Sequence, residues 1–90
     1  MKIINFGTLY IGEKYKKELF DLMVKEYGND CIFCDTYDSE INVREVYGDM
    51  CSGLQKIANY FKEKGVTLNG TIIYYGEWDG YTVVKNNVVR

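Results

Sequence analysis

The stretch EINVREVYGDMCSGLQKIANYFKEK, residues 40–64, contains both secondary-structure patterns that decide the fold. Its first part, Glu40–Tyr47, alternates apolar and polar residues, which is typical of a half-buried strand, although the alternation slips at Val46. Gly48 and Asp49 then interrupt the strand, and Asp49 is suited to cap a helix that we expect to end near Lys64. Apolar residues follow that helix at helical spacing: Met50, Leu54, Ile57, Ala58 and Phe61.

The residues before this stretch have a similar strand and helix order. Lys2–Ile11 is apolar and rich in β-branched residues, which predicts a first strand, and Gly7 within it predicts a bulge or the close approach of another backbone. Glu13–Tyr27 has apolar residues at helical spacing and predicts a first helix. We expect a second strand at Cys31–Tyr37, joined to the strand at 40–47 by a turn at 38–39 and antiparallel to it.

The residues after 64 predict more strands and turns. Asn69-Gly70 is a turn signal, and the Asp-Gly pair in Glu77–Gly80 suits a hairpin connection because both residues tolerate positive φ. Asn86-Asn87 predicts one further turn. The strands that these turns join are expected at Thr71–Tyr75, Tyr81–Lys85 and Val88–Val89, the last a short edge piece.

The expected order is therefore strand, helix, strand, strand, helix, strand, strand, within one domain that spans residues 1–90. This order predicts the α+β class and, within it, a ferredoxin-like split βαβ sandwich with an extra C-terminal hairpin. Its sheet would be antiparallel or mixed, with two helices on one face. The other face would then stay open unless something covers it.

Composition excludes several functions. The chain has no histidine, the commonest general base and metal ligand near neutral pH, and its two serines lie in no nucleophile motif. We therefore expect no enzyme and no cofactor. A net charge of −2 and a pI near 5.0 give no basic footprint for nucleic acid. Neither a long apolar run nor a secretory pattern is present, so we expect a cytoplasmic protein that does not enter a membrane.

The three cysteines leave three chemistries open. Their odd number fits a reducing compartment better than a disulfide framework. Cys31 and Cys34 form a C-x-x-C redox pair, or join Cys51 in a zinc site completed by Asp35 or Asp49, or are small core residues. We favour the core interpretation and predict no metal site, because residues three apart on a strand point to opposite faces.

Residues 35–49 concentrate negative charge, with five acidic residues against the single Arg44. A solvated edge that prevents aggregation is the commonest case. A carboxylate pair for metal binding or catalysis is a second interpretation, although the spacing of a calcium loop is missing. The functional hypothesis is a recognition patch for a basic surface on another protein, with tyrosines as anchors. Its candidate residues are Asp35, Tyr37, Asp38, Glu40, Glu45, Tyr47 and Asp49.

The segment Tyr74–Tyr81 is the most distinctive of the chain. Tyrosines and the only tryptophan flank a tight acidic turn. Trp78 either folds back over the core or forms an exposed hot spot for a partner, since Trp and Tyr dominate such spots. The charged neighbours Glu77 and Asp79 favour partial exposure of Trp78. The candidate partner-binding residues here are Glu77, Trp78, Asp79 and Tyr81.

Two alternative functions remain. Tyrosines on an open sheet face would suit a small ligand or stacked bases, and lysines on the first helix give local support for nucleic acid, although the RNA-binding aromatic pattern is absent. The edge strands at Val83-Val84 and Val88-Val89 would pair between copies in a homo-oligomer.

The second half of the chain carries a resemblance to a known family. The residues involved are Leu54, Ile57-Ala58, Phe61, Gly65–Gly70, Ile73–Glu77 and Val83–Val89. This pattern resembles small ferredoxin-like proteins of phages and mobile elements, some of which inhibit host defence, as anti-CRISPR proteins do. The resemblance implies a protein-binding inhibitor that occludes the basic, nucleic-acid-handling surface of a defence complex. It implies no catalytic residue.

Overall fold

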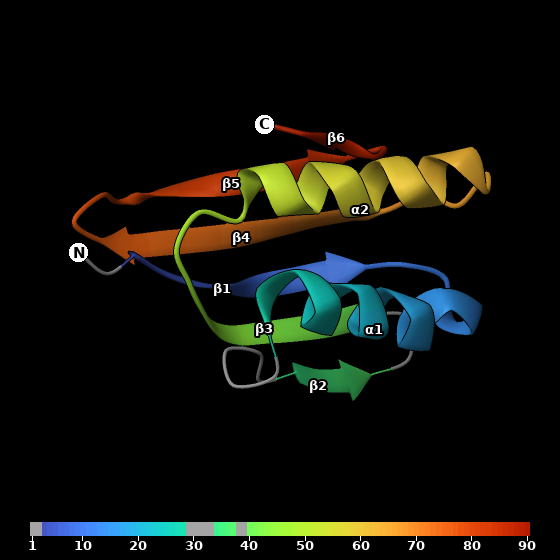
Figure 1. The fold of residues 1–90 in the computed structure, drawn as a ribbon, viewed down its shortest axis with the longest axis horizontal. Coiled ribbons are helices and arrows are strands. Elements are labelled where there is room, and N and C mark those ends of the chain that lie inside the picture. The colour runs from blue at the N-terminus through green and yellow to red at the C-terminus, as the bar shows by residue number, and fades with distance from the viewer. Residues whose placement is uncertain (1–2, 29–33, 38–39) are drawn as a thin grey trace.

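The computed structural model of the chain describes residues 3–28, 34–37 and 40–90. The sequence prediction of the α+β class is confirmed, and the expected order of helices and strands is found (Figure 1). Predictions for residues 31–33 and for the turn at 38–39 lie outside the described residues. The elements are β1 (Ile3–Tyr10), the 3-10 turn η1 (Glu13–Tyr15), α1 (Lys16–Tyr27), β2 (Cys34–Tyr37), β3 (Glu40–Tyr47), α2 (Cys51–Glu63), β4 (Asn69–Gly76), β5 (Gly80–Lys85) and β6 (Val88–Val89).

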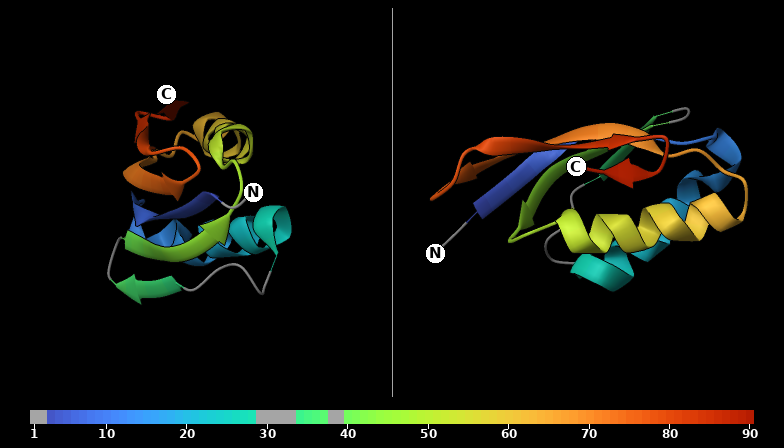
Figure 2. Two further views of the ribbon diagram at one scale, coloured as in Figure 1. Left: turned by 90° about the vertical axis from the view of Figure 1, so that its left-hand side faces the viewer. Right: turned by 90° about the horizontal axis from the view of Figure 1, so that it is seen from above.

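The strands form one six-stranded sheet in the order β2-β3-β1-β4-β5-β6. Every neighbouring pair is antiparallel. Both helices lie against the same face of this sheet, and no described element covers the other face (Figure 2). Within the described part of the chain, no helix combines the length and the apolar character that crossing a membrane requires.

The core fills the space between the sheet and the helices. Alternate strand residues such as Leu9, Ile41 and Ile72 point into it, as the period of two along a strand requires. The predicted apolar stripe of α2 is confirmed, since Leu54 and Phe61 have no exposed surface. Because the buried residues all lie on the helix side, the apolar residues on the other side of each strand are not covered by a second layer of the described chain.

A bulge explains the slip in the alternation at Val46. Between the paired residues Asn5–Val46 and Gly7–Val43, β3 contributes one residue more than β1, so Val43 and Val46 both face the core. The predicted close approach at Gly7 is also present. A Cβ atom there would lie 2.1 Å from the carbonyl oxygen of Thr71, which leaves room for glycine alone.

Three local predictions are wrong. Asn69-Gly70 is no turn but part of β4, where a Cβ atom on Gly70 would meet the backbone of β1 at 2.3 Å. Met50, rather than Asp49, is the N-cap of α2, although Asp49 Oδ1 still accepts the Cys51 N–H at 2.8 Å. Cys51 is exposed and is not a core residue.

The predicted turn at Asn86-Asn87 is confirmed. Both residues have positive φ, 49° and 67°, as the two-residue connection between β5 and β6 favours. The buried Asn87 amide donates to the carbonyls of Ala58 at 2.9 Å and Val66 at 3.0 Å, and its Oδ1 accepts the Leu68 N–H at 3.1 Å. One side chain thereby joins the C-terminal hairpin to the end of α2 and to the segment that follows it.

Candidate functional site

The open face of the sheet carries most of the exposed apolar side chains. Among the residues whose side chains the structure describes, nine large apolar or aromatic ones are exposed, and the strand register puts seven of these on this face. Ile4 lies between Tyr47 and Tyr75, and the next row runs from Phe6 through Ile73 to Tyr81. We call the set Ile4, Phe6, Tyr47, Ile73, Tyr75 and Tyr81 the aromatic face.

The side chains of the aromatic face form a contiguous patch. The rings of Phe6 and Tyr75 meet edge to face, with centroids 5.6 Å apart. Rigid strands hold these side chains, so a partner would pay little conformational entropy to order them. Single exposed apolar residues are ordinary on a protein surface, but a contiguous patch is typical of an interaction site.

Polar residues border the aromatic face toward the other end of the strands. Thr8 donates to the side-chain oxygen of Asn42 at 2.8 Å. Beyond this pair, Tyr10 lies in register with Glu40 on one side and Asn69 on the other. An apolar centre with a polar border is the usual anatomy of a protein–protein interface.

Charge is distributed unequally between the helices and the rest of the chain. Residues 13–27 and 51–64 contain seven of the eleven basic residues and five of the thirteen acidic ones. Three of these acidic residues form ion pairs, Glu18–Lys64 at 2.6 Å, Asp21–Lys17 at 3.0 Å and Glu26–Lys56 at 3.5 Å. Among the described residues, no basic group lies within ion-pair distance of Glu77 or Asp79. The remaining chain therefore has an excess of negative charge.

A cleft of about 500 Å³ lies between the start of α2 and the β4–β5 hairpin. The polar groups at its base are already partnered. The buried Asn5 donates to the carbonyls of Val46 at 2.8 Å and Gly48 at 2.6 Å, which fixes the connection from β3 to α2. The buried Thr82 hydroxyl lies 3.4 Å from the Cys51 thiol. The groups left for a ligand are consequently those of the walls and the rim.

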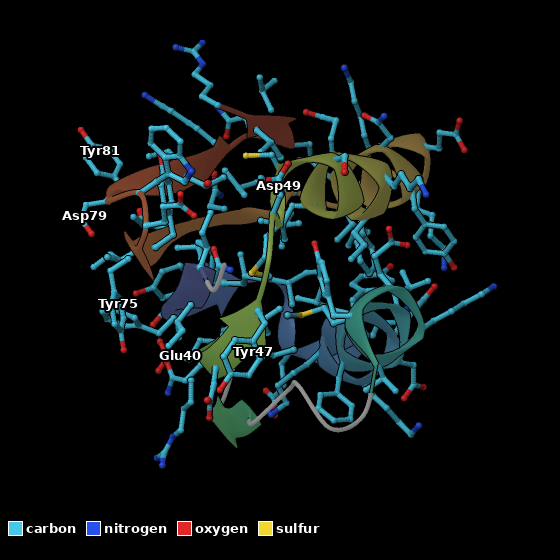
Figure 3. All side chains as sticks on the ribbon, turned by 60° about the vertical axis from the view of Figure 1, so that its left-hand side comes forward. Glu40, Tyr47, Asp49, Tyr75, Asp79 and Tyr81 are labelled. Carbon is cyan, nitrogen blue, oxygen red and sulfur yellow. The ribbon has the colours of Figure 1, made fainter. Side chains whose placement is uncertain are left out.

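Aromatic and carboxylate side chains form these walls. Tyr74, Trp78 and Tyr81 line the cleft together with Asp49, Asp79 and Arg90. Trp78 is 60% exposed, so it does not pack over the core. In Figure 3, Asp49 lies where the chain enters α2, whereas Asp79 and Tyr81 lie on the side of the sheet away from the helices. The cleft thus meets the aromatic face at Tyr81, which contributes to both.

Tyr27 holds the α2 wall of the cleft in place. Its hydroxyl donates to the Met50 carbonyl at 2.9 Å and would lie only 2.6 Å from a Cβ atom on Gly53, so α1 and α2 approach closely here. Burial, with a smaller effect of the nearby Glu26 and Asp49 carboxylates, raises the pKa of Tyr27 well above its usual range. The hydroxyl therefore stays protonated and continues to donate even at the alkaline pH at which an ordinary tyrosine, with a pKa of 10.0, ionises.

The structure brings together only some of the residues singled out from the sequence. Asp49, Trp78, Asp79 and Tyr81 meet at the cleft. Strand residues rise by about 3.3 Å each, so Tyr47 and Glu40 lie toward opposite ends of β3. The others are distributed as follows: Glu45 accepts the Tyr47 hydroxyl, Glu77 is exposed in the hairpin, Asp35 and Tyr37 lie on the edge strand β2 with undescribed side chains, and Asp38 lies outside the described residues.

Sequence reasoning missed the centre of the aromatic face. Phe6, Ile73 and Tyr75 lie in segments that are apolar on both sides, so alternation gave no signal for an exposed side. Within the described residues, no group of three cysteine or acidic side chains is placed to hold a metal ion. The zinc and redox hypotheses involve Cys31 and Cys34, whose side chains are not described, and they stay hypotheses.

No protein-family model, curated protein or solved structure matches this chain at a significant level. The resemblance to small proteins of phages and mobile elements therefore stays a prediction. The geometry of the aromatic face and the cleft is the basis for a function.

Proposed function

We propose that this chain is a protein-binding module that holds a partner with its aromatic face and the neighbouring acidic hairpin. The observation that carries the proposal is that seven of the nine large apolar or aromatic side chains described as exposed gather on the face that no described element covers. Burying apolar area contributes about 25 cal/mol per Å² before the costs of association. A patch of this kind supplies the apolar centre of an interface, and Tyr and Trp are the residues most often found at hot spots.

Charge favours a partner with a basic surface. Glu77 and Asp79 lie in the hairpin beside the aromatic face without a described basic partner, and Glu40 and Glu45 lie on β3. Opposite charges at the rim of an interface increase the association rate and exclude partners of the wrong sign. An inhibitor of a defence complex, as the resemblance implies, is a special case in which the partner is a nucleic-acid-handling protein.

The ferredoxin-like classification of the fold is part of the same proposal. The order β2-β3-β1-β4, with a helix after β1 and another after β3, supports a ferredoxin-like split βαβ unit extended by β5 and β6. A unit of this kind covers one face of its sheet with helices and leaves the other face uncovered, as in Figure 2.

Binding of nucleic acid or a small ligand to the aromatic face is the second candidate. Phe6 and Tyr75 support it, because exposed rings on a sheet stack on bases. The acidic hairpin opposes it, since a phosphate backbone requires positive charge nearby.

Capture from a cell lysate tests the proposal. The double variant Ile73→Ser/Tyr75→Ser removes the middle of the aromatic face, and Tyr60→Ser removes an aromatic side chain that is exposed on α2. We expect the natural chain and the α2 variant to capture the same basic protein from nuclease-treated lysate, and the double variant to lose it. Equal capture by all three would refute the assigned surface. Recovery of nucleic acid alone from untreated lysate would favour the second candidate.

A further inference from the structure

We propose that the cleft between the start of α2 and the β4–β5 hairpin receives an arginine side chain of the protein partner. This inference rests on the proposed protein-binding function and names the group that the partner inserts. At about 500 Å³ the cleft falls within the roughly 300–1,000 Å³ of most ligand pockets, so a long side chain enters with room for its flanking backbone.

The charge of the cleft selects a cation. Asp49 and Asp79 line it against a single Arg90, and no ion pair among the described residues neutralises either carboxylate. The N-terminus of α2 would by itself favour an anion. Asp49 offsets that tendency, because its Oδ1 accepts the Cys51 N–H at 2.8 Å and brings a full negative charge to the helix end. Asp79 then makes the cleft negative overall.

The aromatic walls select a guanidinium group over an ammonium group. Trp78, Tyr74 and Tyr81 line the cleft, and a planar guanidinium stacks on aromatic rings while its edge donates to carboxylates. Asp79 lies in the hairpin together with Trp78, whereas Asp49 lies at the start of α2. Five N–H donors in a planar fork let a guanidinium stack on a ring and still donate to a carboxylate, which the compact lysine ammonium does less well.

The hydrogen bonds at the base of the cleft also favour a cationic ligand over an anionic one. Asn5 and Thr82 are occupied by bonds within the protein, so the base offers no strong unpaired donor for an anionic ligand. Among the described residues, no buried side-chain nitrogen or oxygen lacks a partner. Recognition is consequently left to the aromatic rings and carboxylates of the walls.

Trp78 makes the test direct, because it is the only tryptophan and it lines the cleft. The peptide N-acetyl-Gly-Arg-Gly-amide is titrated into the full chain while tryptophan fluorescence is recorded. The same peptide with citrulline is the uncharged counterpart of equal shape. We expect a saturable change with the arginine peptide, a clearly weaker one with citrulline, and weakening of arginine binding by added salt.

Two matched variants assign the effect to the cleft. Asp79→Asn removes a lining carboxylate, whereas Glu63→Gln removes the same charge from an exposed residue at the far end of α2 that does not line the cleft. An exposed ion pair contributes up to about 1 kcal/mol, so we expect Asp79→Asn to weaken arginine binding about fivefold and Glu63→Gln to leave it unchanged. Thermal unfolding of each variant confirms that the fold is retained.

Equal binding of the two peptides, or equal binding by the two variants, would overturn the inference. Its failure is distinguishable from failure of the proposed function. If partner capture still depends on Ile73 and Tyr75 while the arginine peptide does not bind, the protein-binding function stands and the arginine site falls. If the peptide binds but partner capture does not depend on Ile73 and Tyr75, the arginine site stands and the assigned surface is wrong.

Discussion

Replacing Asn87 with alanine should lower the free energy of unfolding by about 4 kcal/mol. The side chain makes three hydrogen bonds, at 2.9, 3.0 and 3.1 Å, and the residue is 6% exposed. At a net value of about 1 kcal/mol each, their loss accounts for about 3 kcal/mol. Its φ of 67° adds roughly 1 kcal/mol, because alanine tolerates left-handed backbone less well than asparagine does. Small domains have only about 5–15 kcal/mol in total.

Two further variants separate these contributions. Asn87→Gly keeps the backbone freedom and should lose about 3 kcal/mol through the hydrogen bonds alone. Asn86→Ala is the matched control, since Asn86 also has positive φ, 49°, but is exposed and bonds to Asn69 through its backbone N–H. We expect a loss of roughly 1 kcal/mol for Asn86→Ala.

Urea unfolding measures all three variants. Trp78 fluorescence and far-UV circular dichroism should give the same midpoint, and the dependence on urea should keep the slope of the natural chain. The decisive comparison is between the two alanine variants. If Asn87→Ala costs no more than Asn86→Ala, the buried side-chain bonds contribute nothing to stability and the reasoning is refuted.

Three other predictions concern single residues. Gly7→Ala should destabilise the chain by more than about 3 kcal/mol or prevent folding, because the new Cβ would overlap a β4 carbonyl at 2.1 Å. Gly12→Ala is the control and should be tolerated, because the nearest atom to its new Cβ is 3.7 Å away. Thermal unfolding compares the two variants. Because folding raises the pKa of Tyr27, the contribution of this side chain to stability is complete below the ordinary tyrosine value of 10.0 and is lost as pH rises above it. The difference in free energy of unfolding between the natural chain and Tyr27→Phe should therefore be smaller in strongly alkaline urea titrations than in neutral ones. An unchanged difference would contradict the assignment. Hydrogen bonds from Lys64 and Tyr60 hold the pKa of Glu18 below its usual range, so Lys64→Ala should raise that pKa in an NMR titration, while Lys62→Ala, which removes the same charge two residues away, should leave it in place.

Local patterns in the sequence predicted the elements well. The helix stripes and strand alternation are properties of a few consecutive residues, so they need no knowledge of the rest of the chain. The turn at Asn86-Asn87 was predictable for the same reason, because asparagine tolerates positive φ. Asn69-Gly70 was predicted wrongly as a turn. Its glycine is required because the backbone of β1, some sixty residues earlier in the chain, lies too close for a side chain.

The candidate site was predictable only where its signal was local. Charged neighbours on both sides of Trp78 indicated exposure, and the side chain is exposed. Phe6 and Ile73 gave no comparable signal, because the residues on both sides of their strands are apolar. Which side is open depends on where the two helices pack, and that is a property of the whole sheet.

By itself, the sequence determined the helices, the strands and the acidic, aromatic character of the hairpin, because each depends on neighbouring residues. Only the tertiary structure placed Asp49 and Asp79 on the lining of one cleft and gathered Phe6, Tyr47, Ile73 and Tyr81 on one open face. The physical reason is that strand pairing joins residues distant in the chain. The side of the sheet on which the helices bury their apolar stripes then decides which strand residues stay exposed to a partner.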